Sequence, residues 1–169
     1  RTNQIATAER YAAEVLSSIG NKDYATAKKV ATDVAKIGGI SDKLYYALGL
    51  ALFMEGSTGA ARENFRKAHD LKASAPHYAV RLGDTYDADE ETNNSMLYWG
   101  RAAKANSNFV PATSRDLIAK IRRGETAAKV EETFKRFAAF PPEYFGPVDK
   151  AAMAQTRAEL NLREANAAE

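Results

Sequence analysis

Two adjacent windows of sequence decide the fold: residues 42–75, DKLYYALGLALFMEGSTGAARENFRKAHDLKASA, and residues 76–109, PHYAVRLGDTYDADEETNNSMLYWGRAAKANSNF. The second window follows the first after 34 residues and aligns with it without a gap. Small and large residues recur together at the matched positions, which are Gly49 with Gly83, Ala61 with Ser95, Phe65 with Trp99 and Ala68 with Ala102. A repeat of this length predicts a stack of similar units, each buried against its neighbours.

Each window predicts two helices. Apolar residues return every three or four positions, first at Tyr45, Leu48 and Leu52 and then at Ala61 and Phe65. Clusters rich in Gly, Asn, Ser and Pro separate such segments along the whole chain. Alanine supplies about a fifth of the residues, which favours helix over strand. The sequence therefore predicts an all-α chain of antiparallel helix hairpins.

The period and its small and large positions resemble the tetratricopeptide repeat (TPR) family. The flanking windows keep the phase, although Val15 and Ile118 replace the glycine of the central windows. The resemblance implies a right-handed superhelical solenoid of about four hairpins in a repeat domain over residues 1–146. The expected repeats lie near 8–41, 42–75, 76–110 and 111–144.

The last stretch, residues 147–169, is rich in Ala, Glu, Arg and Leu. A terminal repeat leaves an apolar surface that must be covered, so this stretch predicts a C-terminal capping helix. The apolar face expected for it consists of Val148, Ala151, Ala152, Ala158 and Leu162. Docking of the same helix on a partner or on a second copy of the chain stays open.

Composition narrows the function. The formal charge is only +2 and is spread evenly, so we expect no nucleic-acid partner. The chain has no Cys, which removes disulfides, thiol nucleophiles and Cys-ligated metals. Its lack of Cys slightly favours the periplasm or cell envelope over the cytoplasm, and no stretch is apolar enough for membrane insertion.

The residues give little support to catalysis. The two imidazoles, His69 and His77, fall on different helices, and no phosphate-loop, dinucleotide or zinc-protease motif occurs. Acidic residues gather between Asp84 and Glu91, but their spacing is not that of a calcium loop, and a solvated loop before a helix capped near Thr92 explains them. We expect no enzyme activity, no cofactor and no metal.

In the TPR family, the first helix of each hairpin lines a concave groove. Applied to this sequence, the same positions give these candidate partner-binding residues: Tyr46, Leu50, Phe53, Met54, His77, Arg81, Asp84, Arg115 and Arg122. They also place Leu16 and Ile19 of the first hairpin on the groove. The N-terminal half of this groove is predicted to be apolar and the C-terminal half charged, with an excess of Arg.

The helix of residues 42–54 is apolar on nearly every side. Tyr45, Leu48 and Leu52 are expected to form its buried face, so Tyr46, Leu50, Phe53 and Met54 need a second covering. The chain's own C-terminal segment or a partner's peptide or helix could supply it. A homodimer through the apolar groove or the C-terminal helix also stays open.

The resulting functional hypothesis is a non-catalytic scaffold that binds a protein or peptide ligand, set in a bacterial envelope, secretion or pilus assembly. The alternatives are a helical repeat that binds single-stranded nucleic acid and the regulatory TPR region of a larger enzyme.

Overall fold

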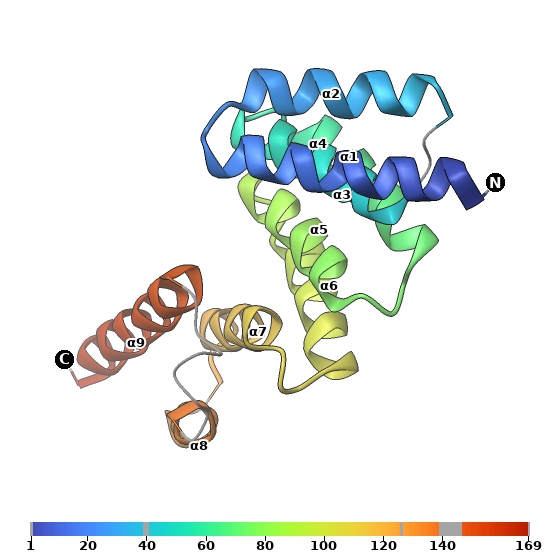
Figure 1. The fold of residues 1–169 in the computed structure, drawn as a ribbon. Helices are drawn as coiled ribbons and strands as arrows, with labels where there is room; N and C mark the ends of the chain where they lie inside the picture. The colour runs from blue at the N-terminus through green and yellow to red at the C-terminus, as the bar shows by residue number, and fades with distance from the viewer. Residues whose placement is uncertain (1, 39–40, 126, 139–146, 169) are drawn as a thin grey trace. The chain divides into compact units, whose positions relative to one another are not determined.

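A computed structural model describes residues 2–38, 41–125, 127–138 and 147–168. These residues form nine helices and no strand, which confirms the predicted all-α class (Figure 1). In chain order they are α1 (Thr2–Gly20), α2 (Tyr24–Lys36), α3 (Asp42–Met54), α4 (Thr58–Leu71), α5 (Pro76–Ala88), α6 (Thr92–Ala105), α7 (Val110–Arg122), α8 (Ala127–Ala138) and α9 (Pro147–Ala168).

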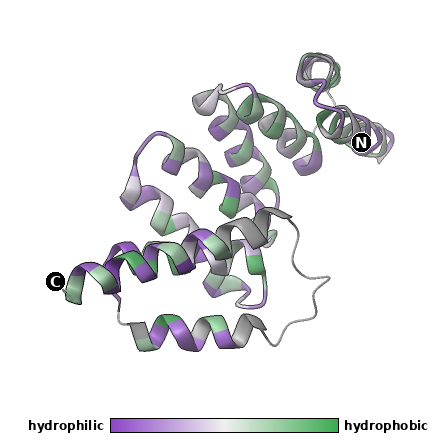
Figure 2. Cartoon of the chain, turned by 90° about the vertical axis from the view of Figure 1, so that its left-hand side faces the viewer, coloured by the Kyte–Doolittle hydropathy of each residue, from purple (hydrophilic) through white to green (hydrophobic). Residues whose placement is uncertain are grey.

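The chain divides into two compact units, residues 1–98 and residues 99–169, and the division falls inside α6. Unit 1 contains α1 to α5 and the start of α6, whereas unit 2 contains the rest of α6 and α7 to α9. Hydrophobic and hydrophilic residues both occur along the helices of the two units (Figure 2).

The turn inside each hairpin repeats with the period of the sequence. Lys22, Gly56, Glu90 and Gly124 follow one another at intervals of 34 residues, and their φ angles are 61°, 82°, 61° and 86°. Each of these residues donates its backbone N–H to the carbonyl three positions earlier, over 2.9 to 3.0 Å. The following residue donates to the carbonyl five positions earlier, again over 2.9 to 3.0 Å. This shared geometry satisfies carbonyls at the end of each first helix, and it extends to the outer hairpins, where the sequence match is weakest.

Left-handed backbone geometry at these turns gives a stability prediction. Glycine adopts a positive φ without the steric cost that a Cβ brings, about 1 kcal/mol or somewhat more. We expect Lys22→Gly to raise the free energy of unfolding by about 0.5 kcal/mol, because relief of the left-handed strain exceeds the stability that is lost through the greater entropy of glycine in the unfolded chain. Gly56→Ala, the reverse change at the equivalent turn, should lower it by about 1 kcal/mol. Urea unfolding of both variants measures this, and a loss of stability in Lys22→Gly would contradict the shared turn geometry.

Helix starts are marked by side chains that the sequence supplies. Asp23 accepts a hydrogen bond from the Thr26 backbone N–H at 3.2 Å, and Ser41 accepts one from Leu44 N–H at 3.0 Å. Pro76 and Pro111 stand in the first turns of α5 and α7, where no intrahelical partner for a backbone N–H is lost. These caps fix where α2, α3, α5 and α7 begin.

The core shared by α1, α2 and α3 is made mostly of alanine. Six of its nine buried residues are Ala, and the other three are Val15, Val34 and Leu44. Because alanine projects only a methyl group, the three helices can approach closely along their length. This small-residue core explains how an alanine-rich sequence packs a hairpin against the next helix.

The core of the second hairpin is centred on Phe65 of α4. A Cβ placed on Gly49 of α3 would lie 2.6 Å from the ring of Phe65, so the missing side chain is what admits the ring. Phe65 also belongs to one buried cluster with Ala61 and with Leu82 of α5. One aromatic side chain thus packs inside its own hairpin and against the next one.

The expected buried face of α3 is wrong in detail. The buried residues of α3 are Leu44, Ala47, Gly49 and Ala51. Tyr45, Leu48 and Leu52 are only half-buried. The reason is that α3 packs against α1, α2 and α4, so burial follows several sides of the helix and not one stripe.

In unit 2, α9 packs along α7 and shares a buried cluster with α7 and α8. That cluster consists of Leu117, Ile121, Val130, Phe134 and Leu160. The apolar face predicted for α9 is wrong where the structure describes it, because Ala158 is exposed and Leu162 is 64% exposed. Thr156 and Leu160 are buried in its place, while the side chains of Val148, Ala151 and Ala152 lie outside the described residues.

Arginines on α9 fix this helix on both sides of Leu160. Arg157 pairs with Glu131 of α8, and its guanidinium carbon lies 3.9 Å from the ring centroid of Phe134. Arg163 donates to the backbone carbonyl of Gly124 at 3.3 Å, just beyond the C-terminal end of α7. Cationic groups at a helix C-terminus are favoured by the helix dipole. Residues 157, 160 and 163 therefore lie on the side of α9 that faces α7 and α8.

Candidate functional site

The candidate site is a face of unit 1 built by the first helices of its hairpins, α1, α3 and α5. Glu9 of α1 and Lys43 of α3 stand one period apart in sequence and form an ion pair at 3.1 Å. Two helical turns further along, Leu16 and Leu50 therefore fall side by side on the same face, and Ile19 and Phe53 follow one turn later.

Side chains of α3 also contact side chains of α5. The ring centroid of Tyr46 lies 5.1 Å from that of His77, with the rings nearly perpendicular, and 5.2 Å from that of Tyr78. Tyr78 donates a hydrogen bond to Asp42 over 2.6 Å. These contacts place Tyr46 between α4 and α5, since its ring also lies 5.8 Å from Phe65. We call the aligned surface the first-helix face; it comprises Glu9, Leu16, Ile19, Lys43, Tyr46, Leu50, Phe53, Met54, His77, Arg81 and Asp84.

The apolar residues of this face differ in exposure. Tyr46, Leu50 and Phe53 are half-buried and pack against the Phe65 cluster. Leu16 is 40% exposed and Met54 is 53% exposed. The face thus has a rigid apolar base, fixed by Phe65, with two side chains that reach solvent.

The charged residues of the face are already engaged within the chain. Arg81 pairs with Asp84 at 3.2 Å. Burial would lower the pKa of Arg81, but the nearby Tyr46 and Asp84 outweigh burial and raise it. Burial lowers the pKa of His77, and the neighbouring Asp42 opposes that shift. Burial and the hydrogen bond to Asp42 raise the pKa of the Tyr78 phenol. At neutral pH the face carries a fixed guanidinium and a neutral imidazole.

The predicted site residues separate into two groups. Tyr46, Leu50, Phe53, Met54, His77, Arg81 and Asp84 come together on α3 and α5 in unit 1. Arg115 and Arg122 lie on α7 in unit 2. Arg115 donates to the carbonyl of Pro111 at 2.9 Å, and Arg122 lies 3.6 Å from Glu159 of α9. Binding of a ligand by any of these residues stays a prediction.

An arginine that sequence reasoning missed organises the turn between α5 and α6. Arg62 of α4 pairs with Asp89 at 2.5 Å and with Glu91 at 3.5 Å, and it donates to the carbonyl of Thr85 at 3.0 Å. Its guanidinium also covers the ring of Tyr86, 4.0 Å from the centroid. The acidic loop is therefore not simply solvated, as expected from the sequence, because two of its carboxylates bind a neighbouring hairpin.

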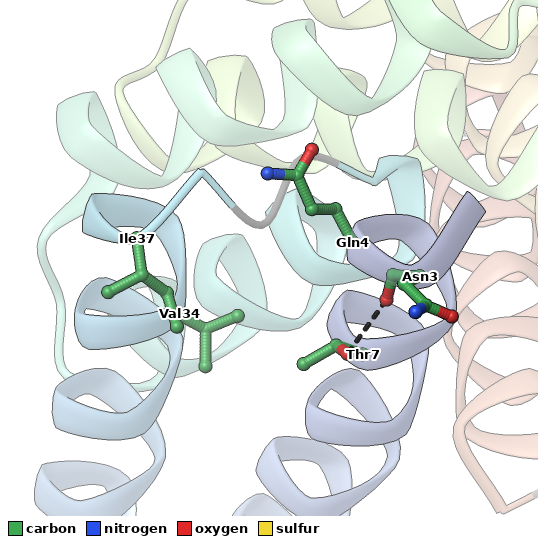
Figure 3. Close-up of a pocket in the computed structure, with 5 residues that line it drawn as sticks. All are labelled: Asn3, Gln4, Thr7, Val34 and Ile37. Atoms are coloured by element: carbon green, nitrogen blue, oxygen red, sulfur yellow. Dashed lines mark hydrogen bonds between the residues drawn. The ribbon is translucent and has the colours of Figure 1, made fainter. Parts of the chain in front are cut away.

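A small pocket of unit 1 lacks titratable groups. A shallow pocket of about 160 Å³ lies between α1 and α2, lined by Asn3, Gln4, Thr7, Val34 and Ile37 (Figure 3). No lining residue is titratable, and the volume is below the 300 Å³ or so of common ligand sites. Among the described side chains, no three potential metal ligands gather. No described helix has both the length and the apolar content to cross a bilayer.

Comparison with known proteins places the fold. No family model matches the sequence, and no curated protein matches it significantly. Solved structures do match. A thermophilic TPR protein of Thermus thermophilus, TTC0263, superposes with a TM-score of 0.71 at 15% identity, over 90% of this chain and 82% of that one. The fold is of the TPR type.

Two structures of MamA agree with this assignment. One has a TM-score of 0.69 at 19% identity and covers 79% of this chain and 81% of that one. The other, MamA from residue 41 to its end from Desulfovibrio magneticus RS-1, has a TM-score of 0.65 at 16% identity, over 76% and 72% of the two chains. At these identities the likeness concerns the fold alone.

Proposed function

We propose that this TPR chain is a non-catalytic protein-interaction scaffold that holds a peptide or helix of a partner protein on its first-helix face. The observation that carries the proposal is the exposure of Leu16 and Met54 beside half-buried Leu50 and Phe53. Exposed apolar side chains next to one another on a helical surface favour a protein ligand. Anchors of that kind bind amphipathic helices in grooves.

Packing beneath the face supports the same function. Phe53 and Phe65 have ring centroids 6.5 Å apart, and Tyr46 contacts Phe65, His77 and Tyr78. Side chains held by such contacts lose little further freedom when a ligand arrives, which lowers the entropic cost of binding. We also propose a setting in a bacterial envelope, secretion or pilus assembly, based on the Cys-free, alanine-rich composition.

Binding should depend on the exposed anchors and not on the buried base. We expect Leu16→Asp combined with Met54→Asp to weaken partner capture by tenfold or more, because a carboxylate would be desolvated at the contact. The melting temperature should change little, since both side chains reach solvent. Affinity capture on the immobilised full chain, quantified by mass spectrometry, measures the loss.

Leu71→Asp is the matched control, because Leu71 is as exposed as Met54, at 53%, but lies at the far end of α4. The proposed face would be contradicted if the Leu16→Asp, Met54→Asp variant and the Leu71→Asp variant lost the same partners, or if neither variant lost any. Phe53→Ala is a poorer probe of binding, because it also removes a ring that packs on Phe65.

A further inference from the structure

The turns that follow α1, α3 and α5 in unit 1 differ in charge, and the turn after α5 is acidic. Building on the proposed function, we propose that the first-helix face takes a basic amphipathic segment of a partner protein. Its apolar side chains contact α1 and α3, and its Lys or Arg residues lie at the turn between α5 and α6. The juxtaposition of an apolar half and an acidic turn sets this orientation.

The apolar half lies near the C-terminal ends of α1 and α3. Leu16 and Leu50 share one register position, Ile19 and Phe53 share the next, and Met54 follows at the end of α3. Within each helix these residues are three or four positions apart, and the apolar anchors of a helical ligand recur at the same spacing.

The acidic half is the turn after α5. Asp89, Glu90 and Glu91 are consecutive carboxylates; Asp89 and Glu91 share the guanidinium of Arg62, and Asn94 also donates to Glu91 at 2.7 Å. The side chains of Asp89 and Glu91 remain 39% and 44% exposed in spite of these pairs, and Glu90 is exposed. Negative charge at this turn therefore remains accessible to a cationic ligand.

The acidic turn is next to the apolar half and differs from the earlier turns. Arg62 stands in the second turn of α4, so its bonds to Asp89 and Glu91 bring the acidic turn beside the start of α4 and the end of α3. The equivalent first turn carries Lys22 and Asp23, of opposite charge. In the second turn, Glu55 pairs with Lys28 at 2.7 Å. Negative charge thus concentrates at the third turn of unit 1, which gives the face a direction.

An acidic ligand fits the same face less well. Arg81, the guanidinium on the face, already pairs with Asp84, whose side chain is only 11% exposed. Lys43 already pairs with Glu9. A carboxylate ligand would have to compete with these neighbours, whereas a cation at the third turn adds to carboxylates that still reach water.

The test selects ligands without assuming their sequence. A displayed library of random peptides about 16 residues long, or about four helical turns, is selected on the immobilised full chain. Peptides that also bind the Leu16→Asp, Met54→Asp variant are removed. We expect the surviving peptides to carry apolar residues at helical spacing and Lys or Arg at one end.

A synthetic surviving peptide with a fluorescent label then tests the orientation by anisotropy. Glu90→Lys should weaken its binding about threefold to tenfold, since the charge at the turn is reversed. Lys is tolerated in this backbone geometry, because Lys22 occupies the equivalent turn with the same φ of 61°. Asp70→Lys makes the same change of charge at the opposite end of α4, with a side chain 70% exposed, and should change binding less than about twofold.

Each other outcome overturns the inference in a distinguishable way. Surviving peptides that are acidic or uncharged would leave the proposed function standing and refute the basic ligand, as would equal binding to the Glu90 and Asp70 variants. If no selected peptide depends on Leu16 and Met54 for binding, both the proposed function and the basic ligand are refuted. A dimer of the full chain that dissociates in the Leu16→Asp, Met54→Asp variant would assign the face to a second copy and also refute the inference.

Discussion

Gly49→Leu is expected to lower the free energy of unfolding by about 3 kcal/mol or more, and so to disrupt the second hairpin. Even a lone Cβ at this position would lie 2.6 Å and 2.7 Å from two ring carbons of Phe65. Phe65 is fully buried and packs against Ala61 and Leu82, so the ring has no space into which to move. Chemical denaturation followed by circular dichroism measures the loss.

Gly59→Leu is the matched control for this prediction. Gly59 is also helical, but a Cβ at Gly59 would meet no atom within 4 Å. Leucine has a higher helix propensity than glycine, so this variant should be as stable as the wild type or more stable by up to about 1 kcal/mol. Equal stability of the Gly49 and Gly59 variants would mean that the two helices of this hairpin do not meet at Gly49, and the repeat packing would be wrong.

Leu160→Ala should produce the second large loss, about 2 to 4 kcal/mol, in the unit formed by residues 99–169. Leu160 is 1% exposed and joins α9 to the buried residues of α7 and α8. Truncation removes apolar contacts and leaves a cavity in that cluster. Thermal or urea unfolding monitored in unit 2 measures the effect.

Leu162→Ala makes the same chemical change two residues later, at a side chain that is 64% exposed. We expect a change within about 0.5 kcal/mol. This pair of variants tests which side of α9 faces the hairpin. A larger loss from Leu162 than from Leu160 would restore the face expected from composition and contradict the observed one.

The fold was largely predictable because it depends on a repeated pattern of size. Gly49 against Phe65 illustrates this: a missing side chain and a large ring recur together one period later at Gly83 and Trp99. Chain breakers placed the hairpin turns. The pattern did not reveal that Lys22 and Glu90 adopt the backbone geometry that Gly56 and Gly124 adopt. A turn can impose a left-handed conformation on a residue that does not favour it, since neighbouring hydrogen bonds outweigh the cost.

Side-chain partners were less predictable than helices. Residues 156, 157, 160 and 163 form the inner side of α9 by helical spacing, but two of them are arginines. A hydropathy pattern therefore misses that side, whereas cation–π contact and capping of carbonyls stabilise it. The pair of Arg62 with Asp89 follows the repeat only in part: Lys28 and Glu55 form the equivalent pair one period earlier, whereas Met96 stands at the position of Arg62 one period later.

The candidate site was likewise predictable only in part. Register along the first helices could be predicted, because equivalent residues of a repeat align. Exposure could not, because Tyr46, Leu50 and Phe53 pack on a ring supplied by α4, whereas Met54 at the end of the same helix does not. Likewise, the sequence placed both Arg81 and Asp84 in the groove but did not show that they pair with each other, one helical turn apart.

The most direct test of partner binding on the first-helix face uses a photo-reactive cross-linking residue. It is placed at Met54 in one variant and at Leu71 in another, two positions of equal exposure, 53%, on different helices. After irradiation in the cells that make the protein, we expect a discrete cross-linked partner from the Met54 position and none from Leu71. The same product from both positions, or a product from Leu71 alone, would contradict binding on this face.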